Sequence, residues 1–161
     1  MFKYLHGSQF VMNSAWIKHP FISQIDKHIV AWMKQWGMLL LRYSLAVVFI
    51  WFGFYKILGV SAANELVAKT VYWFDPHWFI PFLGIWEMLI GICLIRKSLI
   101  RLGLLLMAGQ MIGTFLPLII HPEITFISFP FVLSLEGQYI VKNIVLISAG
   151  IVVGSHVRDQ K

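Results

Sequence analysis

Four long apolar segments dominate this sequence and limit what the chain can fold into. They run from about 38 to 58, 79 to 95, 102 to 120 and 139 to 157. A helix needs about 20 mostly apolar residues to cross the hydrocarbon core of a bilayer, and each segment is close to that length. Only 12% of the 161 residues are charged, whereas soluble domains usually carry about a quarter. We therefore predict an all-α fold, an integral membrane four-helix bundle.

The residues before the first apolar segment have a helical pattern of their own. Between Phe21 and Trp36, apolar side chains recur at helical spacing, with lysine and histidine on the other faces. An amphipathic helix of this kind suits the headgroup layer of a membrane, and a helix that binds a soluble partner is the alternative. We therefore divide the chain into an interfacial segment over 1–37, a membrane domain over 38–157 and a tail over 158–161.

Two segments between the spans are apolar but too short to cross. Residues 60–78 contain a short apolar stripe and an aromatic run, which predicts a helix on the outer interface. Residues 124–137 predict a segment that folds back over the bundle, either as a lid above a cavity or as packing against lipid headgroups. The second span has only about 17 residues, so a buried half-span is the alternative there.

The distribution of basic residues predicts the orientation in the membrane. One side of the predicted bundle collects eight of them, namely Lys18, Lys27, Lys34, Arg96, Lys97, Arg101, Arg158 and Lys161. The other side has at most Lys56, Lys69 and Lys142. Because basic residues are retained in the cytoplasm, we expect both termini to be cytoplasmic. The net charge of +6 then reflects topology and anionic lipid, and a nucleic-acid partner is not predicted.

Six polar side chains inside the predicted spans are the candidate ligand-binding residues. An ionisable group at mid-bilayer costs roughly 3 kcal/mol, so it needs a partner, a water-filled cavity or a function. The six residues are Arg42, Lys56, Glu87, Gln110, Lys142 and Asn143.

Depth along the spans predicts which of these side chains meet. Glu87 lies near the middle of the second span, and Arg42 lies about 6 Å inside the first, so we expect these two to pair. Lys142 is the second candidate partner, and Lys56 is expected either to extend to the interface or to act in the site. Gln110 is placed to bond Glu87 or a ligand carbonyl, or to link helices. Without a partner, Glu87 would stay neutral and resemble a proton carrier.

The sequence offers few ligands for a cofactor. Cys93 is the single cysteine, so chemistry that needs a Cys-x-x-Cys pair is excluded. Histidines lie outside the spans or at their ends, and no metal or haem site is predicted. An electron-carrying role would therefore need a bound quinone or a redox partner protein. Small residues at helical spacing, such as Gly109 with Gly113, predict close helix packing and are compatible with a homodimer.

Three segments resemble DoxX-like membrane proteins. They are residues 41–56, with an arginine followed by an aromatic-Gly-x-x-Lys ending, residues 84–91, with a central glutamate, and residues 137–143. Within that family the chain is most similar to the YkgB type, which is linked to survival of reactive chlorine stress. Asn143 stands where an aspartate is expected, and the first outer loop is shorter. The resemblance implies a four-helix membrane protein associated with redox or sulfur metabolism, since one relative is a subunit of a thiosulfate to quinone oxidoreductase.

Three functions remain open from the sequence. The first is a redox-linked or oxidative-stress component that binds a quinone or similar lipophilic ligand near Glu87. The second is a non-catalytic accessory subunit of a membrane complex, with a membrane redox protein as partner. The third is a small proton-coupled permease. A permease needs an aqueous path, and the spans contain few polar residues that could line one. All three have the lipid bilayer as their environment, and no enzyme class is predicted.

Overall fold

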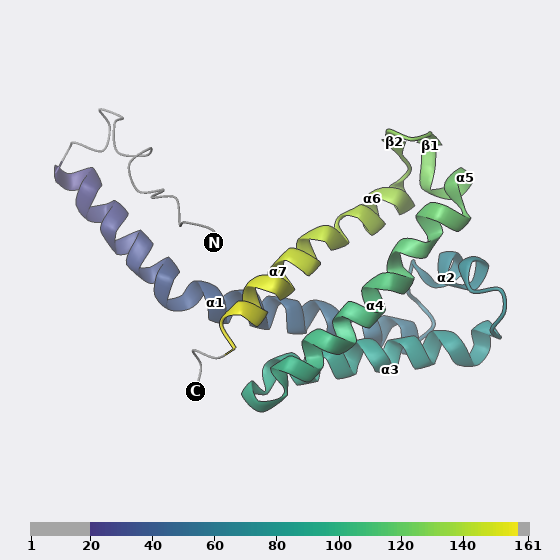
Figure 1. Ribbon diagram of the computed structural model, residues 1–161, viewed down its shortest axis with the longest axis horizontal. Coiled ribbons are helices and arrows are strands. Elements are labelled where there is room, and N and C mark those ends of the chain that lie inside the picture. Colours follow the sequence, from purple (N-terminus) through teal and green to yellow (C-terminus); the bar gives the residue numbers. More distant parts are fainter. Residues whose placement is uncertain (1–19, 158–161) are drawn as a thin grey trace, which may run out of the picture. The chain divides into compact units, whose positions relative to one another are not determined.

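The computed structural model describes residues 20–157. Predictions for the tail 158–161, and for Lys18, Arg158 and Lys161, fall outside the described residues. Within the described range the elements, drawn in Figure 1, are α1 (Pro20–Ile57), α2 (Asn64–Thr70), α3 (Pro76–Ile95), the 3₁₀ helix η2 (Lys97–Leu99), α4 (Ile100–Ile120), α5 (Pro122–Thr125), β1 (Phe126–Ser128), β2 (Val132–Leu133), α6 (Leu135–Val141) and α7 (Asn143–Ser155).

Four helical stretches in the described chain are long and apolar enough to cross a membrane. They are α1, α3, η2 with α4, and α6 with α7. The all-α fold class and the number of spans are therefore confirmed. The fourth stretch starts at Leu135, before the expected position, because Ser134 caps it by accepting a hydrogen bond from the Gly137 backbone N–H.

The second span is longer than its apolar segment indicated. The Asp75 side chain caps α3 by accepting from the backbone N–H of His77, and Pro76 occupies the first turn, where a missing N–H costs nothing. The helix therefore has 20 residues, about 30 Å at the helical rise. The half-span alternative is wrong, because this length matches the hydrocarbon core.

Helix α1 is a single element of 38 residues and continues through the predicted boundary at residue 37. A glycine at position 37 does not end it, since glycine in a helix interior costs only about 1 kcal/mol and no proline follows. The apolar side chains of the first half, such as Phe21 and Ile29, are exposed. A helix over this region is confirmed, and its place in the headgroup layer stays a prediction.

The two outer segments both contain short elements, and only the helix within 60–78 was expected as such. Residues 60–78 contain α2, and residues 124–137 contain the end of α5 and the β1–β2 hairpin, with Phe126 opposite Leu133. The Ser134 N–H donates to the Thr125 carbonyl, which ties the hairpin to the start of α6. Phe131 at the hairpin tip is 90% exposed.

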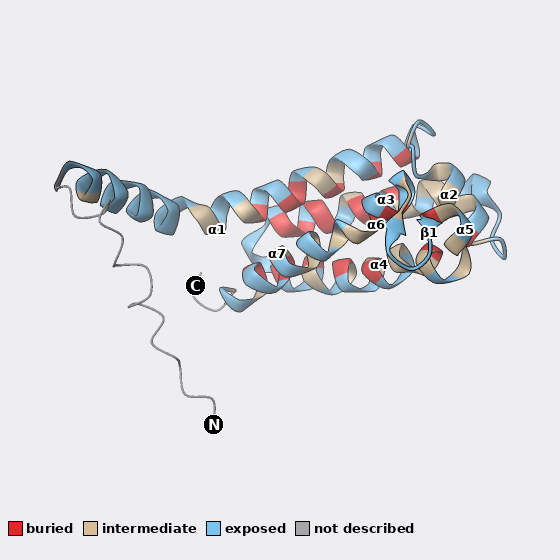
Figure 2. Ribbon diagram, turned by 90° about the horizontal axis from the view of Figure 1, so that it is seen from above, coloured by how far each residue is buried: buried red, intermediate tan, exposed pale blue. Residues whose placement is uncertain are grey.

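Beyond residue 38 the spans form a thin bundle with a narrow buried seam. Figure 2 shows the buried residues on the sides of the helices that face one another, with exposed residues on the other sides. The buried apolar set includes Phe49, Ile90, Leu94 and Val153. Outward side chains are also large and apolar, as expected of helices solvated by lipid tails.

Glycines allow α1 and α3 to approach very closely. A Cβ at Gly84 would lie 2.6 Å from the Gly53 carbonyl oxygen, and one at Gly91 would lie 2.6 Å from the Ala46 carbonyl oxygen. A Cβ at Gly53 would in turn collide with the Gly84 carbonyl. Helices in lipid associate mainly by such backbone proximity, since burying apolar surface gains little there. The α1–α3 contact is thus fixed by small residues.

We expect Gly84→Ala to destabilise the bundle by about 1–3 kcal/mol, because the added methyl group must push α1 and α3 apart. The matched control is Gly113→Ala, where a Cβ would meet nothing within 4 Å. That variant should be neutral or slightly stabilising, because alanine favours helices. Thermal unfolding of both variants in the same detergent tests the packing. Equal melting temperatures would contradict it.

Candidate functional site

The polar centre of the bundle is an ion pair between Lys56 on α1 and Glu87 on α3. The Lys56 ammonium donates to both carboxylate oxygens, with Nζ 2.8 Å from Oε1 and 2.7 Å from Oε2. The two side chains are 8% and 9% exposed. Charges so far from water are stable only when paired in good geometry, and this bidentate contact meets that condition.

Gln110 on α4 completes the site. Its Nε2 donates to Glu87 Oε1 at 2.9 Å, so that oxygen accepts from two helices at once. The backbone carbonyl oxygen of Gln110 accepts a hydrogen bond of 3.0 Å from the hydroxyl of Thr114, which lies one turn later on α4. The expected bond between Gln110 and Glu87 is confirmed. Lys56, Glu87 and Gln110, which we call the polar triad, join three of the four spans at one point.

The expected pair between Arg42 and Glu87 is wrong, and Lys56 does not extend to the interface. A pair between Arg42 and Glu87 would require the outer ends of the first two spans to lie at one level. In the structure Ile57, the last residue of α1, lies against Gly84, well inside α3. That offset brings Lys56 level with Glu87. Arg42 is 14 residues earlier on α1, about 21 Å along its axis.

Arg42 is nevertheless a buried residue, with 3% of its surface exposed. Its guanidinium carbon lies 5.0 Å from the centre of the neighbouring Tyr43 ring, within the range of a cation–π contact. Arg42 therefore belongs to a different level of the bundle from the polar triad.

Lys142 and Asn143 lie at an interruption of the fourth span. Helix α6 ends at Val141 and α7 begins at Asn143, whose side-chain Nδ2 donates to the carbonyls of Tyr139 and Ile140. The Lys142 ammonium lies 3.9 Å from the centre of the Tyr139 ring and 5.9 Å from that of Phe52. Neither side chain contacts Glu87, so the second predicted partner for the carboxylate is also wrong.

Comparison with known proteins assigns the fold. The family model DoxX matches residues 37–122, which is more than half of the chain. The chain belongs to the DoxX family. The match includes all three residues of the polar triad, and it ends before α6, so Lys142 and Asn143 lie outside it. Among curated proteins and among solved structures, no match is found.

Sequence reasoning missed the signal that pairs Lys56 with Glu87 in this DoxX protein. Gly53 precedes Lys56 by three residues, and Gly84 precedes Glu87 by three residues. Helices α1 and α3 run in opposite directions, and Gly53 of α1 contacts Gly84 of α3. Lys56 and Glu87 each lie about one turn beyond this glycine contact, on the face that borders the other helix. Two Gly-x-x-charge patterns on consecutive spans therefore predict a buried pair.

The rest of the described chain offers little else for a cofactor. No group of three or more His, Cys, Asp or Glu side chains within residues 20–157 is placed to hold a metal ion. Cys93 is a buried free thiol in the same range. The polar triad is therefore the best candidate site in this DoxX domain.

We expect Lys56→Met and Glu87→Leu, each alone, to destabilise the protein by about 3–5 kcal/mol, because each leaves a buried charge without its partner. The double variant should recover most of that loss, because it leaves no charge behind. The matched control is the ion pair between Lys69 and Glu65, which has the same 2.7 Å distance and lies in the open.

Removing that exposed pair with Lys69→Met and Glu65→Leu should change stability little, because exposed pairs are screened by water. Unfolding of all six variants in one detergent is the measurement. Equal losses for the buried and the exposed lysine would contradict the assignment, and so would a double variant less stable than both singles.

Proposed function

We propose that this protein is a redox-linked membrane component that binds a quinone, or a similar lipophilic ligand with carbonyl oxygens, at the polar triad. The observation that carries the proposal is the convergence of three polar side chains from three helices inside an apolar bundle. Ligand sites have this composition, with a mainly apolar lining and a few converging polar groups.

The charge balance of the triad favours a neutral ligand. Lys56 and Glu87 neutralise each other, so the site carries no net charge that would recruit an anion or a cation. The Lys56 ammonium has three N–H groups, and both of its hydrogen bonds are to Glu87. Gln110 uses its Nε2 there, and its side-chain oxygen is an acceptor.

The polar groups of a quinone head group complement these remaining atoms in hydrogen-bonding chemistry. Its carbonyl oxygens accept hydrogen bonds, which the Lys56 ammonium would supply. The hydroxyl groups of the reduced quinol donate, and the Gln110 oxygen would accept. In this proposal electrons come from a partner redox protein in the membrane, and the DoxX protein holds the ligand.

On the resemblance to the YkgB type, we extend the proposal to a role in survival of reactive chlorine stress. With that family context we propose a bacterial inner membrane and cytoplasmic termini. The orientation is supported by Arg96, Lys97 and Arg101 between α3 and α4, since short basic loops stay in the cytoplasm.

A second candidate function is that of a non-catalytic accessory subunit. The observation that favours it is that both oxygens of the Glu87 carboxylate already accept hydrogen bonds from donors of the same chain. A carboxylate satisfied in this way serves to fix helix register without any ligand. Proton-coupled transport has less support, because the side chains of Lys56 and Glu87 are both almost fully buried.

Extraction of bound lipids separates the first two functions. The full-length protein is purified gently, its intact mass is measured by native mass spectrometry, and its lipids are extracted and searched for isoprenoid quinones. We expect wild type and the control Lys69→Met to retain quinone, and Lys56→Met and Gln110→Leu to lose it. Gln110→Leu keeps the ion pair, so it tests the ligand without exposing a buried charge.

Quinone that is retained equally by Gln110→Leu and Lys56→Met would place the ligand elsewhere. Wild-type protein that carries only phospholipid, together with a stable protein partner, would overturn the redox proposal and support the accessory subunit.

The orientation has its own test. We expect a reporter that is active only in the cytoplasm to be active when fused after residue 157 or inserted at Ser98, and inactive when inserted at Phe131. Ser98 lies in the basic turn, and Phe131 lies at the exposed hairpin tip. Activity at Phe131 would reverse the proposed topology.

A further inference from the structure

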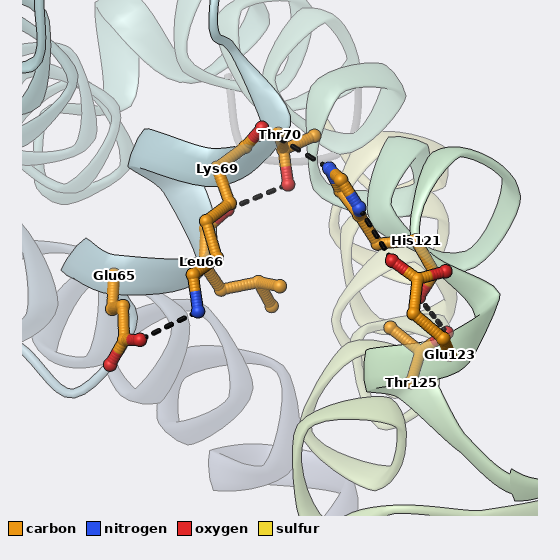
Figure 3. Close-up of polar contacts among 7 residues, drawn as sticks. All are labelled: Glu65, Leu66, Lys69, Thr70, His121, Glu123 and Thr125. Carbon is orange, nitrogen blue, oxygen red and sulfur yellow. Dashed lines mark hydrogen bonds and ion pairs between the residues drawn. The ribbon is translucent and has the colours of Figure 1, made fainter.

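A histidine at the end of α4 bridges two outer elements of the bundle. The ring of His121 lies between α2 and α5, as Figure 3 shows. Its Nδ1 is 2.9 Å from Glu123 Oε1, and its Nε2 is 3.1 Å from the backbone carbonyl oxygen of Lys69. We call His121, Glu123 and the Lys69 carbonyl the α2 clasp.

Both ring nitrogens of His121 therefore face atoms that only accept hydrogen bonds. A carboxylate oxygen and a backbone carbonyl oxygen have no proton to donate at neutral pH. A neutral imidazole carries one N–H, so it can satisfy one of these contacts and must direct a lone pair at the other. Only the imidazolium donates to both. The two contacts together require a protonated ring.

Local backbone geometry holds the three parts in place. Pro122 starts α5 directly after His121, and the Thr125 N–H and hydroxyl both donate to the His121 carbonyl, at 3.1 Å and 3.0 Å. On α2, the Thr70 hydroxyl donates to the Leu66 carbonyl at 2.6 Å, and Thr70 is almost fully buried. The residues that supply the carboxylate and the carbonyl thus lie in turns with hydrogen bonds of their own, independent of the ring.

The charges around the ring favour its protonated form. The hydrogen bond with Glu123 raises the pKa of His121 above its ordinary value of 6.5, with further help from the Lys69 carbonyl. The same contact lowers the pKa of Glu123 below 4.5. The Lys69 ammonium opposes protonation, but it is bound to Glu65 at 2.7 Å. From α6, which packs on α5, Glu136 forms no ion pair with His121.

We propose that His121 is a proton-dependent clasp that fastens α2 to the α4–α5 corner when the aqueous phase at that end of the bundle is acidic, and that loosens α2 when the ring is neutral. Helix α2 has only seven residues, and seven-residue helices are not stable alone in water. Its order depends on such tertiary contacts. The inference does not depend on the polar triad binding a quinone.

The direction of the pH dependence follows from both groups. Because the pKa of His121 is raised, the stability that its protonated ring adds to the clasp is complete below pH 6.5. That stability is lost as the pH rises through the raised pKa. Because the pKa of Glu123 is lowered, the stability that its ionised carboxylate adds to the clasp is complete above pH 4.5. That stability is lost as the pH falls through the lowered pKa. The clasp is therefore strongest between about pH 4.5 and 6.5.

Hydrogen–deuterium exchange on the full-length protein in nanodiscs tests the clasp. After correction for the intrinsic pH dependence of exchange, we expect residues 64–71 to exchange roughly fivefold more slowly at pH 5.5 than at pH 8.5, the effect of about one hydrogen bond. His121→Gln should abolish this difference. His77→Gln is the matched control, because the hydrogen bond of His77 to Asp75 at the start of α3 is donated by its backbone N–H and not by its ring.

Two results would overturn the proposal. One is protection of α2 that is equal at the two pH values in wild type, and the other is a pH difference that persists in His121→Gln. Nitrogen-15 spectra of histidine-labelled wild type give an independent readout, with His121 assigned by its loss in the variant. We expect both of its ring nitrogens to be protonated at pH 6, and a neutral tautomer there would also exclude the clasp.

Discussion

A buried charge pair between the first two membrane spans is the constraint on which the rest of this structure depends. Lys56 and Glu87 cannot lie in an apolar bundle separately, so their contact fixes how α1 and α3 slide against each other. The glycines beside them allow the two backbones to come close enough for the pair to form. Gln110 then sets the position of α4 on the same carboxylate.

This arrangement gives one set of residues two compatible properties. The triad is satisfied within the chain, so the bundle needs no ligand in order to be stable. It also gathers the polar atoms of three spans at one level and leaves donor and acceptor capacity there. The same residues are therefore both the structural link between three spans and the site at which we propose that a lipophilic ligand binds. The accessory subunit and the ligand-binding component differ in whether a ligand occupies the unused donor and acceptor atoms of the triad.

The parts of the fold that could be predicted are those governed by composition and local pattern. Apolar length alone indicated four spans, and the polar residues within them included all three members of the triad. The pairing could not be derived by counting residues from span ends, because α3 starts at the Asp75 cap and extends well beyond the level at which α1 stops. Register between helices is a tertiary property, and here it is fixed by the contact of Lys56 with Glu87, which the close approach at Gly53 and Gly84 allows.

The α2 clasp shows a second limit of sequence reasoning. His121 and Glu123 are two residues apart in the sequence, and that spacing alone does not indicate that the histidine bridges two elements. The third member is a backbone carbonyl that lies 52 residues away in the sequence and has no side-chain signature. Contacts of this kind become visible only when the chain is folded.

The sequence separation of the ion pair has a consequence for how the protein enters its membrane. Lys56 and Glu87 are 31 residues apart and lie on consecutive spans. Each span alone would present an unpaired charge to lipid, at a cost of roughly 3 kcal/mol. As a helical hairpin the two can neutralise each other while the rest of the chain is still being synthesised. The first two spans are thus suited to leave the insertion machinery together, with the contact of Gln110 added when the third span enters.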